Sequence, residues 1–145
     1  MRILYVIGKS QYDSTAIFME QMAEHMEACG WKVTVLDGRK EDGYAEQRKK
    51  VLQDDYDVVL TINGMLLEED SDLGNRLLQN ENVLYCTYLM DHPVIHYERL
   101  KNPYPKMFVL SPDRNHVAFM DQYMKNIYAE AFLCLLYTSD AADEL

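Results

Sequence analysis

Long apolar runs and a surplus of positive charge are both missing from this chain of 145 residues. No stretch approaches the roughly 20 consecutive apolar residues that a membrane-spanning helix needs. The start, Met1 to Gly8, is too short for a secretion signal and has no cleavage site, so we expect a cytoplasmic protein without a membrane span. The formal net charge of −10 disfavours nucleic acid as a partner, because phosphate groups repel an acidic surface.

Cysteine is scarce, and its three copies, Cys29, Cys86 and Cys134, are irregularly spaced. They form no CxxC pair and no grouping with histidine, so the sequence supports neither a disulfide framework nor a zinc site. We therefore expect buried free thiols, no metal and no cofactor.

Glycine is scarce as well, and the segment from Gly8 to Thr15 lacks the glycines of a P-loop or a dinucleotide fingerprint. Its hydroxyl groups could still hold an anion, which makes Ser10 a candidate substrate-binding residue, with an ordinary turn as the alternative. Asp37 lies where a ribose-binding acid lies in dinucleotide folds, but without the glycine motif a turn aspartate is the better interpretation.

Apolar runs alternate with helical patterns along the whole chain, which is typical of βα units around a parallel sheet. Because the chain can bury one ordinary core, we expect a single α/β domain, a Rossmann-like three-layer fold with a mainly parallel sheet of five or six strands. The expected strands are 2–7, 31–37, 58–62, 83–89, 106–110 and 129–133. The expected helices start at Asp13 or Ser14, cover 44–52 and 66–78, and start again at Ser111-Pro112.

Titratable side chains gather where the expected fourth strand stops. A histidine titrates near neutrality and a carboxylate beside it can set its tautomer, so Asp91 and His92 are the catalytic candidates. Neighbours on an extended backbone point to opposite sides, so contact between the two is not assured. Pro93 holds His92 extended, which suits a presented group or a simple strand stop. His96 is a candidate substrate-binding residue, with a solvated helix face as the alternative.

A second polar group, with Asp113, Asn115 and His116, follows the expected fifth strand. The carboxyl ends of neighbouring parallel strands share one rim, so both groups should face the same ligand crevice. Asp113 near a helix start is also explained by the helix dipole alone. Asn115, His116 and Asn63, which follows the third strand, complete the candidate substrate-binding residues.

The last residues, 134–145, resemble the conceptual translation of a sequencing adapter. Their composition shifts to small and acidic residues without periodicity. We exclude them from functional reasoning as a non-native tail, and we expect the natural protein to continue past Leu133. Without Asp140, Asp143 and Glu144 the charge changes from −10 to −7, so the acidic conclusion stands.

Three motifs, Asp91-His92-Pro93, His96-Tyr97 and the run from Phe108 to His116, resemble the amino-terminal domain of CgeB-like (spore-maturation type) glycosyltransferases. That domain carries an Asp-x-Pro element, an aromatic or histidine-containing helix, and a strand followed by an Asp-Arg-x-His-like stretch. The resemblance spans roughly Met1 to Leu133, and the motifs are specific as a set.

The resemblance implies one half of a bacterial GT-B enzyme, in which two Rossmann-like domains face each other across a cleft. It implies that this half shapes the acceptor side, while the missing carboxyl-terminal domain holds most contacts to a nucleotide-sugar donor. The acceptor is unknown. A lone acceptor-side domain should be catalytically silent, because transfer needs both reactants in one water-poor cleft. Asp91 or His92 would accept a proton if the enzyme inverts configuration, and a retaining enzyme needs no protein base.

Two other classes of protein stay open on the residues alone. A flavodoxin-like or receiver-like module would bind a small ligand or a partner without catalysis. A stand-alone interaction domain would have a polar rim that only marks the ends of strands.

Overall fold

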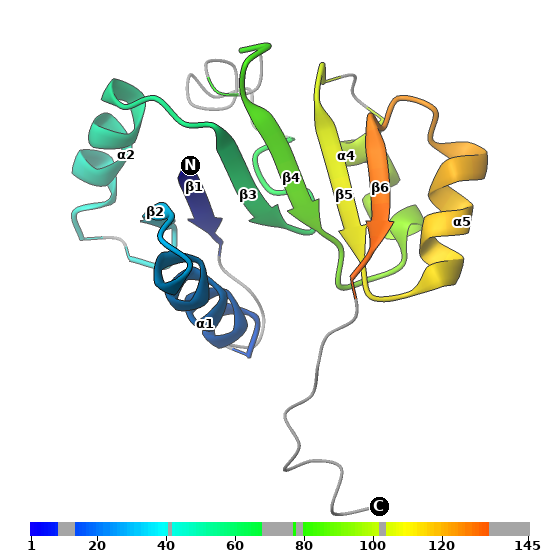
Figure 1. Ribbon diagram of the computed structural model, residues 1–145, viewed down its shortest axis with the longest axis horizontal. Coiled ribbons are helices and arrows are strands. Elements are labelled where there is room, and N and C mark those ends of the chain that lie inside the picture. The colour runs from blue at the N-terminus through cyan, green and yellow to red at the C-terminus, as the bar shows by residue number, and fades with distance from the viewer. Residues whose placement is uncertain (9–13, 41, 68–76, 78–79, 102–103, 134–145) are drawn as a thin grey trace, which may run out of the picture.

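The computed structural model describes residues 1–8, 14–40, 42–67, 77, 80–101 and 104–133. One parallel sheet has helices on both of its faces, which is the expected Rossmann-like three-layer α/β fold (Figure 1). The strands are β1 (Arg2–Ile7), β2 (Lys32–Asp37), β3 (Val58–Ile62), β4 (Leu84–Tyr88), β5 (Met107–Ser111) and β6 (Ala129–Phe132).

The six strands lie in the order β2-β1-β3-β4-β5-β6, and every pair is parallel. The arrowheads of β3, β4, β5 and β6 therefore reach one edge of the sheet in Figure 1. The chain moves from β1 outward to β2 and then returns past β1 to β3. This reversal creates a topological switch point between β1 and β3, and ligands of such sheets bind beside the carboxyl ends of the strands.

The helices divide unequally between the two faces of the sheet. They are α1 (Ser14–Ala28), α2 (Tyr44–Gln53), the 3-10 helix η1 (Pro93–His96), α4 (Tyr97–Leu100) and α5 (Arg114–Tyr123). Helix α1 packs on one face, and α2, α4 and α5 pack on the other. Right-handed crossovers explain this division, because every connection after β2 crosses the sheet in the same direction.

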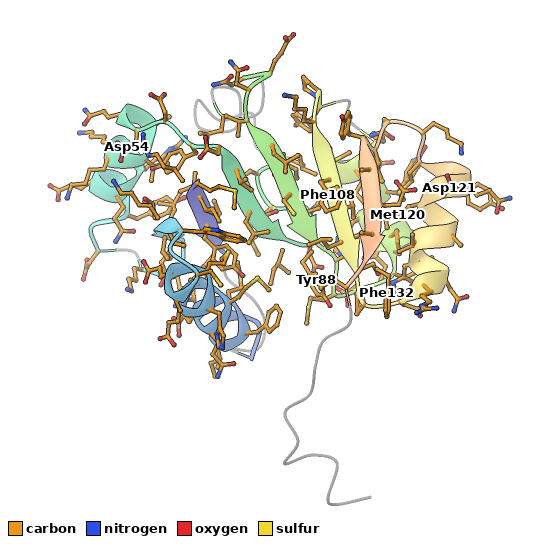
Figure 2. All side chains as sticks on the ribbon, in the orientation of Figure 1. Asp54, Tyr88, Phe108, Met120, Asp121 and Phe132 are labelled. Atoms are coloured by element: carbon orange, nitrogen blue, oxygen red, sulfur yellow. The ribbon has the colours of Figure 1, made fainter. Side chains whose placement is uncertain are left out.

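Two apolar cores fill the spaces between these layers. The larger core joins α2, α4 and α5 to the sheet through Val51, Leu100 and Met120, and these side chains are fully or almost fully buried. In Figure 2, Met120 lies on the sheet side of α5, whereas the neighbouring Asp121 points away from it. The smaller core packs the methionine face of α1, with Met19 and Met26, against β1, β3 and β4. Burial of this methionine face agrees with the helical spacing of those residues.

One expected helix boundary is wrong at the start of the 66–78 segment. Leu66 has a backbone φ of +71°, in the left-handed region, and residues 63–66 form turns. Hydrogen bonds from Met65 N–H to Ile62 O and from Leu67 N–H to Gly64 O close these turns. Most of the remaining segment lies outside the described residues.

A second correction concerns the helix cap near Ser111-Pro112. Ser111 is the last residue of β5, and Asp113 caps α5 by accepting a hydrogen bond from the Asn115 N–H at 2.7 Å. Ser111 is still paired with Phe132 in the sheet, and Asp113 takes the cap position, so the helix begins two residues later than expected, at Arg114. Asp113 also places a carboxylate at the positive end of the helix dipole.

Candidate functional site

The candidate site lies along the carboxyl ends of β3, β4 and β5. In Figure 2, Tyr88 marks the end of β4 and Phe132 the end of β6, on the same edge. Polar side chains follow each of the three strands: Asn63 after β3, Asp91 and His92 after β4, and Asp113 and His116 after β5. Two clusters of contacting side chains result.

The first cluster connects Asn63, Asp91 and His96. Nδ2 of Asn63 donates to Oδ2 of Asp91 at 3.1 Å, and Nε2 of His96 lies 3.5 Å from the same oxygen. His96 is only 7% exposed, so the alternative of a solvated face is wrong for this residue. The Asp91 side chain keeps 54% of its surface exposed. The protein thus contacts one oxygen of the carboxylate, Oδ2, while about half of the side chain remains exposed to solvent.

The second cluster brings His92 and His116 together. Their ring centroids lie 4.7 Å apart in an edge-to-face arrangement, and the His92 ring packs in the same way on Phe119 at 5.0 Å. His116 Nδ1 lies 3.1 Å from the hydroxyl of Ser111, and its Nε2 lies 3.8 Å from a carboxylate oxygen of Asp113. The two polar groups that follow β4 and β5 therefore meet at one rim.

The hydrogen bonds assign roles to the histidine nitrogens. Val94 N–H donates to Nδ1 of His92 at 3.2 Å, so neutral His92 carries its proton on Nε2 and can only donate there. Asp113 N–H donates to the Ser111 hydroxyl oxygen at 3.3 Å, and the hydroxyl proton can be donated to His116 Nδ1 at 3.1 Å. In the tautomer that accepts this proton, the Nε2 proton of His116 faces the Asp113 carboxylate. Neutral His92 then has no free nitrogen to accept a proton, whereas the half-exposed Asp91 carboxylate can accept one.

Asp91 and His92 face different neighbours, as the alternation of an extended backbone suggests. Asp91 faces Asn63 and His96, whereas His92 faces His116 and Phe119. The two adjacent residues thus place a proton acceptor, Asp91, and a hydrogen-bond donor, His92, on opposite sides of the chain just before η1 begins at Pro93.

The turn that carries Asn63 rests on buried polar contacts. The Tyr85 hydroxyl donates to Met65 O at 2.6 Å and lies 2.8 Å from the Thr61 hydroxyl. Burial raises the pKa of Tyr85 above its usual value, so the phenol stays protonated as a donor. Gly64 N–H donates to the Thr87 hydroxyl at 2.9 Å. Hydroxyl groups inside the sheet therefore fix the loop after β3.

At the switch point, the ends of β1 and β3 touch. A Cβ atom added to Gly8 would lie 2.7 Å from the sulfur of Met65, so the end of the thioether packs directly on this glycine. The described part of the rim between β1 and β3 is thus filled by Met65. The polar chemistry lies one strand further along, above β4 and β5.

Asp37, at the end of β2, is committed to an ion pair. Its oxygens accept from Nε and Nη2 of Arg39, both at 2.8 Å, and Arg39 also bonds Glu20. The hydrogen bonds from Arg39 hold the pKa of Asp37 below its usual value, although burial opposes this effect. This geometry agrees with a structural aspartate and leaves no carboxylate edge for a ribose.

Two candidate residues are not drawn into the clusters. Asn115 is exposed on the first turn of α5, and the bond it makes among the described residues runs from its backbone N–H to Asp113. Ser10 lies outside the described residues.

Sequence reasoning missed residues that act from behind the site. Arg99 donates through Nη1 to Asn63 O at 2.9 Å, and Phe119 supports the His92 ring. The signal for Phe119 was its spacing of three residues from His116 on one helix. No local sequence pattern predicts the hydrogen bond from Arg99, because it joins α4 to the end of β3, which is far away in the sequence.

Within the ranges that the structure describes, no three His, Cys, Asp or Glu side chains are grouped to hold a metal ion. Among the same residues, no helix has both the length and the apolar composition for crossing a membrane. No protein-family model matches the chain, and no curated protein sequence matches it.

Proposed function

We propose that this chain is the acceptor-side half of a bacterial glycosyltransferase of GT-B design, related to the CgeB-like enzymes. The observation that carries the proposal is the Asp91 carboxylate. Its Oδ2 accepts a hydrogen bond from Asn63 and lies 3.5 Å from Nε2 of His96, yet the side chain remains about half exposed at the rim. A positioned carboxylate of this kind suits a general base. The motif resemblance supplies the reaction class.

In the proposed reaction, a hydroxyl oxygen of the acceptor attacks the anomeric carbon of a nucleotide sugar. Asp91 accepts the hydroxyl proton as the new C–O bond forms, and the bond from the sugar to the diphosphate breaks. The nucleoside diphosphate leaves with the bonding electron pair. His92, with its proton on Nε2, serves as a hydrogen-bond donor to a substrate oxygen rather than as the base.

The domain that would complete the cleft is a further part of the proposal. It would hold the nucleotide sugar opposite the rim of β4 and β5, and it would exclude water from the reacting groups. The described half then binds the acceptor substrate. It supplies Asp91 as the base and His92 as a hydrogen-bond donor. A chain lacking that second domain should release no nucleoside diphosphate.

The rival flavodoxin-like class shares the strand order that begins 2-1-3-4-5. Fold alone does not decide function. Flavin mononucleotide binds such proteins at the β1/β3 switch point, where Met65 packs against Gly8 in this chain. Purified protein with a yellow colour or flavin fluorescence would support the rival class and contradict the glycosyltransferase.

The decisive test uses the full-length parent, obtained from independent template DNA that extends past the codon for Leu133. Release of nucleoside diphosphate is measured with a panel of nucleotide sugars and candidate acceptors. Asp91→Ala should lower kcat/KM by about 10²–10⁴-fold, the usual contribution of a general base. Turnover that is undiminished in Asp91→Ala would refute the role of Asp91.

The matched control is Asp121→Ala, because Asp121 is an exposed carboxylate on α5 with 77% of its side-chain surface accessible. It should retain the parental rate. An independent template that encodes no second α/β domain after Leu133 would contradict the proposed architecture.

A further inference from the structure

Asn63 joins the ends of β3 and β4 through both polar atoms of its side chain. Its Oδ1 accepts from Met90 N–H at 2.8 Å, and its Nδ2 donates to Asp91 Oδ2 at 3.1 Å. The amide oxygen and one amide N–H are therefore both bonded to the protein. Few polar atoms of this side chain remain for a substrate, so its main task is not to bind one. We propose that Asn63 is a positioning residue that orients the Asp91 carboxylate, an inference that rests on the proposed function.

The backbone of Asn63 is fixed as firmly as its side chain. Its N–H donates to Tyr88 O at 3.0 Å, and its carbonyl accepts from Arg99 at 2.9 Å. The next residue, Gly64, donates its N–H to the Thr87 hydroxyl, and a Cβ atom added to it would contact the Arg99 stem at 3.4 Å. Contacts from β4 and from α4 thus hold the turn in place before any ligand arrives. Such supporting contacts keep catalytic side chains close to the geometry that the reaction needs.

The conformation of this turn explains why asparagine stands at position 63. Its φ is +53°, in the left-handed region, and asparagine is one of the few residues besides glycine that enter this region readily. Glycine would keep the turn but lose the amide. Aspartate would keep an acceptor for Met90 N–H but would place a second carboxylate against Asp91. Of these three residues, only asparagine combines the turn with a donor for Asp91.

The amide acts on one oxygen of Asp91 and leaves the group accessible. Oδ2 receives the Asn63 donor and faces the buried His96 ring, while about half of the side-chain surface stays open. A carboxylate fixed on one edge loses little rotational freedom when an acceptor binds, so the reacting geometry is prepared in advance. Asn63 would therefore affect the chemical step more than acceptor binding.

The kinetic test compares Asn63→Gly and Asn63→Asp in the full-length parent. Both should lower kcat by about 100-fold, the effect of misplacing a reacting group, while KM stays within about threefold of the parental value. In Asn63→Asp the acidic limb of the pH profile should move to higher pH, because two adjacent carboxylates resist joint ionisation. A raised KM with unchanged kcat and an unchanged pH profile would make Asn63 a substrate ligand and overturn the proposal.

A second test needs no activity and uses the present chain. The side-chain amide resonances of Asn63 in ¹H–¹⁵N spectra should shift in Asp91→Ala, whereas those of exposed Asn82 should stay in place. Unchanged Asn63 resonances would overturn the positioning role whatever the enzyme assay shows. A shift of these resonances without any sugar transfer in the parent would instead refute the proposed function and retain the contact between Asn63 and Asp91.

Discussion

The rings of His92 and His116 meet edge to face with their centroids 4.7 Å apart, although they follow different strands. Aromatic pairs prefer this arrangement because the positive edge of one ring meets the negative face of the other. Each ring is held by further contacts, His92 by Phe119 and His116 by Ser111. The pair therefore joins the segments that follow β4 and β5 at the candidate site.

A first prediction concerns the proton on His92. Because Val94 N–H occupies Nδ1, neutral His92 should carry its proton on Nε2. Long-range ¹H–¹⁵N spectra of the imidazole distinguish the two tautomers. A proton found on Nδ1 would contradict the donor role and would return His92 to the list of candidate bases.

The architecture could be predicted from the sequence because local signals agree with each other along most of the chain. All six expected strands match the structure within one residue at each end, and β1 and β3 match without difference. Parallel strands buried on both faces leave continuous apolar runs, and such runs are easily recognised. The order of the strands in the sheet was not predicted, since it depends on packing between segments far apart in sequence.

For the candidate site, the sequence predicted which edge of the sheet carries the polar residues, but not which of their side chains contact one another. Parallel topology alone brings the residues after β4 and β5 to one edge, and the meeting of His92 with His116 confirms that expectation. The pairing of Asp91 with Asn63 and His96 was not predicted, because it depends on a left-handed turn after β3. No sequence period marks a single residue with positive φ.

A second prediction uses that turn. Leu66 is 6% exposed and has a φ of +71°, which costs a branched side chain roughly 1–2 kcal/mol of backbone energy. Both Leu66→Ala and Leu66→Gly should destabilise the fold, by about 2–5 kcal/mol for the lost packing. Glycine relieves the backbone strain, so Leu66→Gly should be more stable than Leu66→Ala by about 1 kcal/mol.

Urea denaturation of both variants measures this difference in the free energy of unfolding. At an ordinary buried position alanine is the milder replacement, and Leu77→Ala against Leu77→Gly supplies that control, since Leu77 is also 6% exposed and lies in a helical position. If the alanine variant were more stable than the glycine variant at both positions, the backbone strain assigned to Leu66 would be contradicted.

A third prediction concerns the two described thiols. Cys29 is exposed, whereas Cys86 is buried in the sheet and burial raises its pKa to about 12. The thiolate is the reactive form, so Cys86 should react at least about 100-fold more slowly than Cys29 at pH 8. Labelling is followed by intact mass in a Cys134→Ser background, which leaves only these two thiols.

Cys29→Ser provides the control for that experiment. It should remove the fast label and leave the slow one, and urea should then make Cys86 react at the rate of an ordinary thiol. Fast labelling of Cys86 in folded Cys29→Ser would show that the face of the sheet beneath α1 opens readily.

A fourth prediction concerns the ion pair at the end of β2. Asp37 is 4% exposed, and Arg39→Ala would leave this carboxylate without its two charged hydrogen bonds. We expect a loss of about 1–3 kcal/mol in the free energy of unfolding at pH 7, since the partly exposed guanidinium is screened by water. Lys40→Ala is the matched control, because Lys40 lies 3.7 Å from Asp37 with most of its side chain exposed, and it should cost much less.

The pH dependence of that loss has a definite sign. The pKa of Asp37 is lower in the folded protein than in the unfolded chain, where it is about 4, because Arg39 stabilises the charged form. The stabilisation is therefore complete above about pH 4 and disappears as the pH falls through the folded pKa, where the carboxylate becomes protonated. Urea denaturation of both proteins at several pH values should show their difference shrinking below about pH 4. A difference that stays constant down to low pH would mean that Arg39 stabilises the fold by packing and not by its charge.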